Sequence, residues 1–291
     1  MLFSGCGEET SVDLPSCPDG TTWSFIVIGD TRSNPDIFGQ HIENINGLSP
    51  APELFLHTGD MVTQFDLDIE WSIFHSVMKQ LKYKIPFHPA VGNHDVTDDE
   101  RTREIYKIET GVNGPLYYSF YFRSVLFIVL STPEKGYTRL IAGDQLDWLK
   151  STLTNSNADR IIVLLHVPLF PQGHDRGKGV YNAGQIHDLF IRYGVSIVFA
   201  GHEHQFFFNE FDGISYVITG GGGAPLYHEN GGDFYHFVRA CCGKNQIHLQ
   251  VIGLDGKLIS AYQINKNSPK KAEMRVRETQ PSFKESIAHE E

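Results

Sequence analysis

Gly92-Asn93-His94-Asp95 directly follows a short apolar run at residues 87–91, and this stretch decides the fold. Such a run is typical of a buried strand. Four other apolar runs end in similar polar groups, namely Gly29-Asp30-Thr31-Arg32, Gly59-Asp60, His166 and Gly201-His202-Glu203-His204. In open α/β sheets, groups at the carboxyl ends of strands meet in one crevice. We therefore expect these side chains to converge.

The rest of the chain supports a layered α/β fold. Amphipathic segments at 36–46, 68–81, 100–109, 143–154 and 183–193 alternate with apolar runs at 24–29, 54–58, 87–91, 125–131, 161–166 and 195–200. This order predicts helices between strands. Residues 117–122 and 125–130 are predicted to pair as a tight hairpin. After Gly201 we expect successive antiparallel strands at 206–211, 214–219, 234–240, 247–252 and 258–264.

Composition limits the class of protein. The 291 residues are 41% apolar and 20% charged, which is a globular balance. The 24 Lys and Arg against 35 Asp and Glu give a charge of −11, so long nucleic acids are not expected partners. No apolar run approaches the roughly 18 residues of a spanning helix. Four Cys do not make a disulfide scaffold. We expect that disulfides do not hold the fold together, and that Cys241 and Cys242 are small apolar residues on opposite faces of a strand.

The two ends of the chain have open interpretations. Small residues before Cys6 are typical of a bacterial lipoprotein, although Phe3 is unusual there and no basic or apolar region precedes it. Either Cys6 carries a lipid anchor, with 1–22 as a tether and a periplasmic or cell-surface location, or it is incidental and a cytoplasmic location stays open. Cys17 is expected to be a free thiol or a partner for Cys6. Residues 266–291 are predicted to be a polar tail, with a loosely docked helix as the alternative.

The polar groups at the strand ends are candidate metal ligands. A single Gly-Asp is most often a turn, and a single His is more often a core residue. The Gly-His-x-His pair is more specific, because its two imidazoles point the same way from an extended segment. Carboxylate, amide and imidazole donors suit Fe, Zn or Mn. The ordered set therefore predicts a metal centre built from Asp30, Asp60, Asn93, His166, His202 and His204.

This ordered set resembles the calcineurin-like metallophosphoesterases, which include purple acid phosphatases and cyclic-nucleotide phosphodiesterases. The resemblance covers residues 23–265 as one domain and implies a four-layer α/β/β/α sandwich of two mixed sheets, with two metals at one rim. It implies one metal bound by Asp30, Asp60 and His204, and a second by Asp60, Asn93, His166 and His202. It also implies that His94 faces the substrate and is held by Asp95.

Arg32 departs from the family pattern, in which the first motif reads Asp-x-His. Arginine has no lone pair to donate, so one ligand of the first metal is lost. Purple acid phosphatases instead use a Tyr three residues after the bridging Asp, where this chain has Thr63. Our hypothesis is that Arg32 binds a substrate phosphate oxygen and that the first metal is held weakly. The alternative is that Arg32 only pairs with an acidic neighbour.

The resemblance implies hydrolysis of a small phosphate mono- or diester by a metal-activated water, with His94 protonating the leaving oxygen. His174 lies in a loop with Asp175 and Arg176 and is a candidate substrate contact, unless this loop is merely solvated. Two rivals remain. One is a binding scaffold with a degraded metal site, which the absence of the first-motif His favours. The other is a nuclease of the same fold, which the charge of −11 disfavours.

Overall fold

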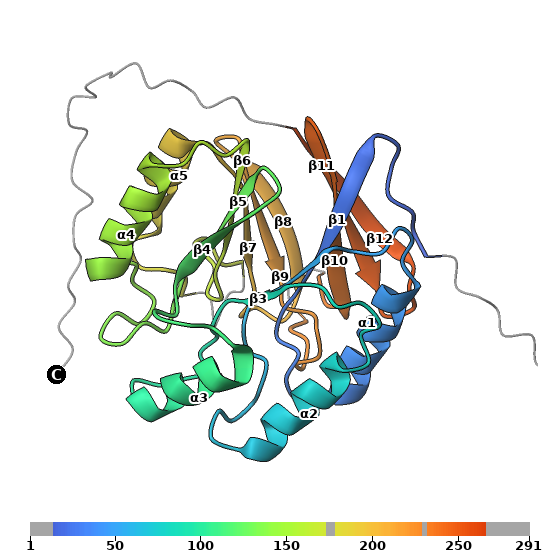
Figure 1. Cartoon of the computed structure of the whole chain (residues 1–291), viewed down its shortest axis with the longest axis horizontal. Coiled ribbons are helices and arrows are strands. Elements are labelled where there is room, and N and C mark those ends of the chain that lie inside the picture. Colours follow the sequence, from blue (N-terminus) through green and yellow to red (C-terminus); the bar gives the residue numbers. More distant parts are fainter. Residues whose placement is uncertain (1–13, 173–177, 229–231, 266–291) are drawn as a thin grey trace, which may run out of the picture.

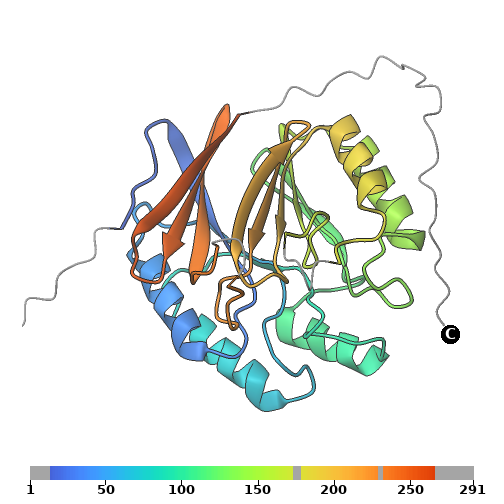
Figure 2. The same cartoon turned by 180° about the vertical axis from the view of Figure 1, so that it is seen from behind.

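The computed structural model describes residues 14–172, 178–228 and 232–265, and in it two six-stranded sheets face each other. Helices cover the outer faces of both sheets (Figures 1 and 2). The first sheet has the order β12 (Leu258–Asn265), β11 (Gln246–Gly253), β10 (His236–Gly243), β1 (Thr21–Ile28), β2 (Leu54–His57), β3 (Phe87–Pro89). The second has the order β4 (Tyr118–Phe122), β5 (Val125–Val129), β6 (Arg160–Leu164), β7 (Val195–Ala200), β9 (Ile214–Thr219), β8 (Phe206–Phe211).

The helices divide between the two sheets. Helices α1 (Pro35–Gly47) and α2 (Asp68–Met78) pack on the outer face of the first sheet, and α3 (Glu100–Thr110) lies beside α2. Helices α4 (Gly143–Thr154) and α5 (Ala183–Tyr193) pack on the outer face of the second sheet. The four layers are therefore α/β/β/α, as the family resemblance implies (Figure 1).

The alternation of side chains along β1 explains why both faces of the first sheet are covered. Phe25 and Val27 enter the core between the sheets, whereas Ile26 and Ile28 pack against the outer helices. The Phe25 and Phe127 rings pack edge to face with their centroids 5.5 Å apart. A strand that is buried on both faces has no polar side, so its sequence is a continuous apolar run.

The strands after Gly201 differ in part from the prediction. Strands β8 and β9 are antiparallel to each other, but β9 runs parallel to β7. The chain then crosses to the first sheet, where β10 pairs with β1 and continues as the antiparallel series β10, β11, β12. The expectation of one antiparallel series was wrong because apolar periodicity identifies a strand but not its neighbour. The hairpin of β4 and β5 is confirmed.

A disulfide joins Cys17 to Cys241 of β10, with the two Cα atoms 5.7 Å apart. We expected that disulfides do not hold the fold together, that Cys241 is a small apolar residue, and that Cys17 is a free thiol or pairs with Cys6. These expectations were wrong. The two cysteines are 224 residues apart, so only the folded chain brings them together. Cys242 points to the other face of β10 and belongs to the core between the sheets, as predicted.

Residues 14–20 are attached to the first sheet by more than this bond. The buried Arg239 guanidinium donates to the carbonyls of Pro15 and Pro50, and the Gln250 amide donates to the carbonyl of Ser16. Residues 14–22 therefore belong to the folded domain and not to the predicted tether at 1–22. The last two of them already form the start of β1. Residues 1–13, with Cys6, and the predicted tail at 266–291 lie outside the described residues. Among the described helices, none is long and apolar enough to cross a membrane.

We expect that Cys17→Ser lowers the free energy of unfolding by about 2–5 kcal/mol, because the disulfide closes a very long loop in the unfolded chain. Urea unfolding with and without dithiothreitol measures this effect. Reductant should lower the urea midpoint of the wild type to that of Cys17→Ser and leave the variant unchanged. A wild-type midpoint that does not respond to complete reduction would contradict the prediction.

Candidate metal centre

The predicted ligands gather at the carboxyl ends of parallel strands from both sheets. Asp30, Asp60 and Asn93 follow β1, β2 and β3 of the first sheet. His166 follows β6, and His202 and His204 follow β7 of the second. Because parallel strands end at the same edge of a sheet, the two facing sheets bring all six residues to one rim. We call these six residues the candidate metal centre.

Asp30, Asp60 and His204 form the first group of donors. Each offers one atom, these atoms all lie within 4.8 Å of one another, and all three residues are buried. The Nε2 atom of His204 lies 3.5 Å from Oδ1 of Asp30. This is the donor set that the family resemblance implies for one metal.

Asn93, His166 and His202 form the second group. The Oδ1 atom of Asn93 lies 3.1 Å from Nε2 of His166 and 3.0 Å from Nδ1 of His202. These two nitrogens are 3.3 Å apart. Oδ1 of Asp60 lies 3.3 Å from Nε2 of His166, so Asp60 stands between the two groups as a bridging ligand would.

The outer nitrogens of two imidazoles are bound to backbone carbonyls. Nδ1–H of His166 donates to the Thr58 carbonyl at 2.9 Å, and Nδ1–H of His204 donates to the Pro225 carbonyl at 2.7 Å. In a neutral imidazole, this leaves a lone pair on each Nε2, facing carboxylate and amide oxygens. These nitrogen lone pairs and the oxygen lone pairs that they face repel each other at hydrogen-bond distance unless a cation lies between them. The residues therefore fit divalent or trivalent metal ions.

The electrostatics keep the three imidazoles neutral. Burial lowers the pKa of all three imidazoles, to about 3 for His202 and to about 4 for His204. The charge of His166 lowers the pKa of His202 further, and that of Arg32 lowers the pKa of His204 further. Burial and then the charge of Asp60 raise the pKa of Asp30 well above its usual range. Burial alone would raise the pKa of Asp60 as well, but His166 and His94 hold it below its usual value. The ligand nitrogens are thus available to a metal at neutral pH.

Backbone strain is concentrated at the same residues. Asp30 has a φ of 56°, Asp60 of 59° and His202 of 70°, all in the left-handed region that costs energy for residues other than glycine. Gly92 permits the close approach of two loops here, because a Cβ at this position would collide with the Asp60 backbone and carboxylate. The strained turns aim the ligand side chains of separate strands at one point.

Arg32 lies beside the first group. Its Nε atom is 3.4 Å from Oδ2 of Asp60, and its Nη2 atom is 3.4 Å from Nε2 of His204. Arg32 therefore does pair with an acidic neighbour, as the alternative interpretation holds, but this neighbour is itself a candidate metal ligand. A fixed positive charge so close to the first group is expected to weaken a metal bound there.

The expected contact between His94 and Asp95 is not found. The Asp95 carboxylate accepts hydrogen bonds from the backbone N–H groups of Asp60, Met61, Val62 and Gly92. Nδ1–H of His94 instead donates to the Thr63 carbonyl at 3.0 Å. Asp95 therefore positions the loop that carries Asp60, and a backbone carbonyl orients His94. The prediction was wrong because neighbouring residues in a tight turn point in different directions.

Three residues of the site were missed or given another meaning from the sequence. Thr63 was considered only as the position of a missing Tyr, and its carbonyl could not be foreseen. The Glu70 carboxylate accepts the backbone N–H groups of Thr63 and Gln64, which fixes this loop. The centroid of the Tyr227 ring lies 4.5 Å from that of the His204 ring. The candidate contacts His174, Asp175 and Arg176 lie outside the described residues.

The comparisons with known proteins agree with this geometry. The model of the calcineurin-like phosphoesterase family matches residues 24–206. The serine/threonine-protein phosphatase CPPED1 of Homo sapiens is 28% identical over 208 residues, which are 64% of this chain and 64% of that protein. The tartrate-resistant acid phosphatase type 5 of Homo sapiens is 27% identical over 248 residues, with 72% and 76% coverage.

A solved structure has the same fold. Purple acid phosphatase PPD1 from seeds of yellow lupin (Lupinus luteus) superposes with a TM-score of 0.69 at 16% identity, over 87% of this chain and 55% of that one. The match to CPPED1 spans about 64% of that protein's length. On the family match, this chain is a metallophosphoesterase-fold protein. It belongs to the calcineurin-like phosphoesterase family.

Proposed function

We propose that this chain hydrolyses a small phosphate mono- or diester at the candidate metal centre. The observation that carries the proposal is the convergence of carboxylate, amide and neutral imidazole acceptors, with Asp60 between the two donor groups. The phosphatase names of its relatives support the same class of reaction. Two ions of Fe, Zn or Mn held by these residues would supply Lewis-acid and water-activating chemistry.

The chain's own residues bind and orient the substrate. The Arg32 guanidinium supplies a permanent positive charge and paired N–H donors for a phosphate oxygen. The His94 imidazole is fixed through Nδ1–H, so its Nε2 is the nitrogen left to hold or deliver a proton at the leaving oxygen. Asp95 keeps the Asp60 loop in place through four backbone amides.

Release of p-nitrophenol from p-nitrophenyl phosphate and from bis-p-nitrophenyl phosphate tests the proposal. The full chain is assayed after loading with Mn²⁺, Zn²⁺ or Fe²⁺ in turn. We expect turnover with at least one metal, and the ratio between the two substrates assigns monoesterase or diesterase activity. No turnover with any metal on either substrate would favour the second candidate function, a binding scaffold with a degraded metal site. The Arg32 substitution is the observation in favour of that candidate.

We expect that Arg32→His increases metal retention, because it removes a fixed charge 3.4 Å from Asp60 and adds an imidazole at the usual ligand position. Metal content after dialysis against chelator, measured by mass spectrometry, should be below two equivalents in the wild type and higher in the variant. Arg32→Ala is the control that removes the charge without adding a ligand. Two tightly held equivalents in the wild type would contradict the weak first site.

We infer further that the chain matures in an oxidising compartment, such as the periplasm or the cell surface. The Cys17–Cys241 disulfide supports this location, because such bonds persist where thiols are not kept reduced. The lipid anchor at Cys6 stays a prediction. Comparing the reductant response of the urea midpoint in exported and cytosolic preparations tests the inference, and a disulfide formed equally in both would contradict it.

A further inference from the structure

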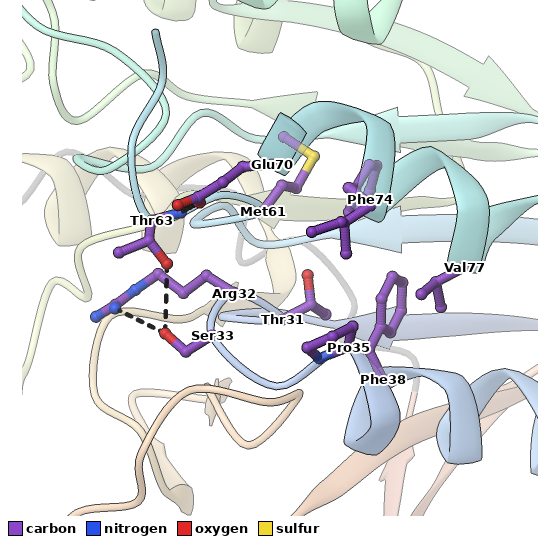
Figure 3. A pocket seen from close by; sticks show the side chains of 11 residues that line it. Thr31, Arg32, Ser33, Pro35, Phe38, Met61, Thr63, Glu70, Phe74 and Val77 are labelled. Atoms are coloured by element: carbon purple, nitrogen blue, oxygen red, sulfur yellow. Dashed lines mark hydrogen bonds between the residues drawn. The ribbon is translucent and has the colours of Figure 1, made fainter. Parts of the chain in front are cut away.

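A pocket of about 160 Å³ lies between α1, α2 and the loops that follow β1 and β2. Figure 3 shows Arg32, Ser33 and Thr63 at one end of it, and Phe38, Phe74 and Val77 at the other. The family match and the metal chemistry give this pocket no role. We call it the side pocket.

The side pocket shares a wall with the candidate metal centre. Arg32 lines the pocket, while its Nε and Nη2 atoms contact Asp60 and His204 of the centre. Thr31 and Met61 also line the pocket, and each directly follows a candidate ligand in the chain. The Arg32 side chain is therefore common to the pocket and to the candidate metal centre. At this wall, the Ser33 hydroxyl lies 3.4 Å from Nη1 of Arg32 and 3.4 Å from the Thr63 hydroxyl.

The lining of the side pocket fits an uncharged ring. Apolar side chains from both helices, together with Met61, form most of it, and the Phe38 and Phe74 rings are stacked with centroids 5.6 Å apart. An apolar cavity of roughly 150 Å³ is large enough to hold benzene. The charged residues of its described lining are Arg32 and Glu70, and Glu70 already accepts the backbone amides of Thr63 and Gln64. That carboxylate would repel an acidic substituent on the ring.

We propose that the side pocket receives the aromatic ring of an aryl phosphoester whose phosphate lies at the candidate metal centre. Arg32 then contacts both parts of the substrate, with its guanidinium on the phosphate and its methylene stem beside the ring. The inference rests on the proposed function and adds the class of leaving group. It makes the side pocket a specificity site for aryl over small alkyl or polyol esters.

Binding of two non-hydrolysable phosphonates to the metal-loaded full chain tests the proposal by calorimetry. Phenylphosphonate should bind about tenfold more tightly than methylphosphonate, because only the phenyl ring buries apolar surface in the side pocket. Ile73→Asp places a charge in the lining and should reduce this ratio to near one. Ile69→Asp, on the same helix but outside the lining, is the matched control and should keep it. Ile73 is 40% and Ile69 63% exposed, so neither change disturbs the core.

The outcomes separate this inference from the proposed function. Equal affinities for phenylphosphonate and methylphosphonate would overturn the proposal that the side pocket binds a ring. The same holds if Ile73→Asp and Ile69→Asp change the ratio of these affinities by the same factor. Such a protein can still hydrolyse esters and leave the proposed function intact. A chain that prefers phenylphosphonate but hydrolyses no ester would support the ring site and refute the proposed function. Loss of discrimination in Ile73→Asp alone supports the inference.

Discussion

Asp60→Asn is expected to lose more than about 100-fold in metal affinity and with it nearly all phosphoesterase activity. Among the described residues, Asp60 is the carboxylate that lies between the two donor groups, close to His166 on one side and within the Asp30 and His204 group on the other. Even changes to residues that only support a ligand cost roughly 10–100-fold in affinity or activity, so loss of a bridging charge should cost more. Metal content and turnover of the purified variant measure the effect.

A stability measurement separates ligand loss from misfolding in this variant. Burial and then the charge of Asp60 raise the pKa of Asp30, so the two carboxylates repel each other in the metal-free protein. Asp60→Asn removes this repulsion but also the attraction of His166 and Arg32 for the Asp60 charge, so the free energy of unfolding of the metal-free variant should stay close to that of the metal-free wild type. The exposed Asp66→Asn, six residues along the chain, is the matched control and should keep metal and activity. A metal-free Asp60→Asn that unfolds much more easily than the wild type would point to a structural role instead.

His94→Ala should reduce turnover by roughly 10²–10⁴-fold, the usual contribution of a general acid, while metal content stays almost unchanged. The reason is that the imidazole is bound to the Thr63 carbonyl and belongs to neither donor group. The loss should be smaller for p-nitrophenyl phosphate than for an alkyl ester, because p-nitrophenolate leaves without needing a proton. Turnover on both esters and metal analysis of the same preparation measure these effects.

The control for this variant is His75→Ala. His75 is also partly exposed and held by a polar neighbour, Glu109, but it lies on α2 away from the donors. It should lose little activity on either ester. If His94→Ala lost metal and activity in equal proportion, His94 would be a ligand or a support of one, and its role as a proton donor would be refuted.

The layered fold could be predicted from the sequence because its signals are local. The apolar run of β1, for example, continues without a polar side because both of its faces are buried, and this property is visible in the residues themselves. The order of Gly-Asp, Gly-Asn-His-Asp and Gly-His-x-His at successive strand ends is equally local, and the convergence of these groups follows from parallel strands ending at one edge.

Features that depend on distant residues could not be predicted in this way. The place of β10 beside β1 and the bond between Cys17 and Cys241 join segments more than 200 residues apart in the chain, and nothing local encodes either pairing. The direction of a side chain within a turn was also beyond local signals. Asp95 follows His94 directly, yet its carboxylate points to four backbone amides and the imidazole points to Thr63.

Local sequence patterns are enough to identify the strands and the polar groups at their ends, since burial and turn chemistry act between near neighbours. The pairing of Arg32 with Asp60, the carbonyl that holds His94 and the ring-sized pocket between the metal-binding loops and helices α1 and α2 are visible only in the folded chain. Those features arise where separate loops and helices meet. Their geometry is set by the packing of the whole domain, which no single stretch of sequence contains.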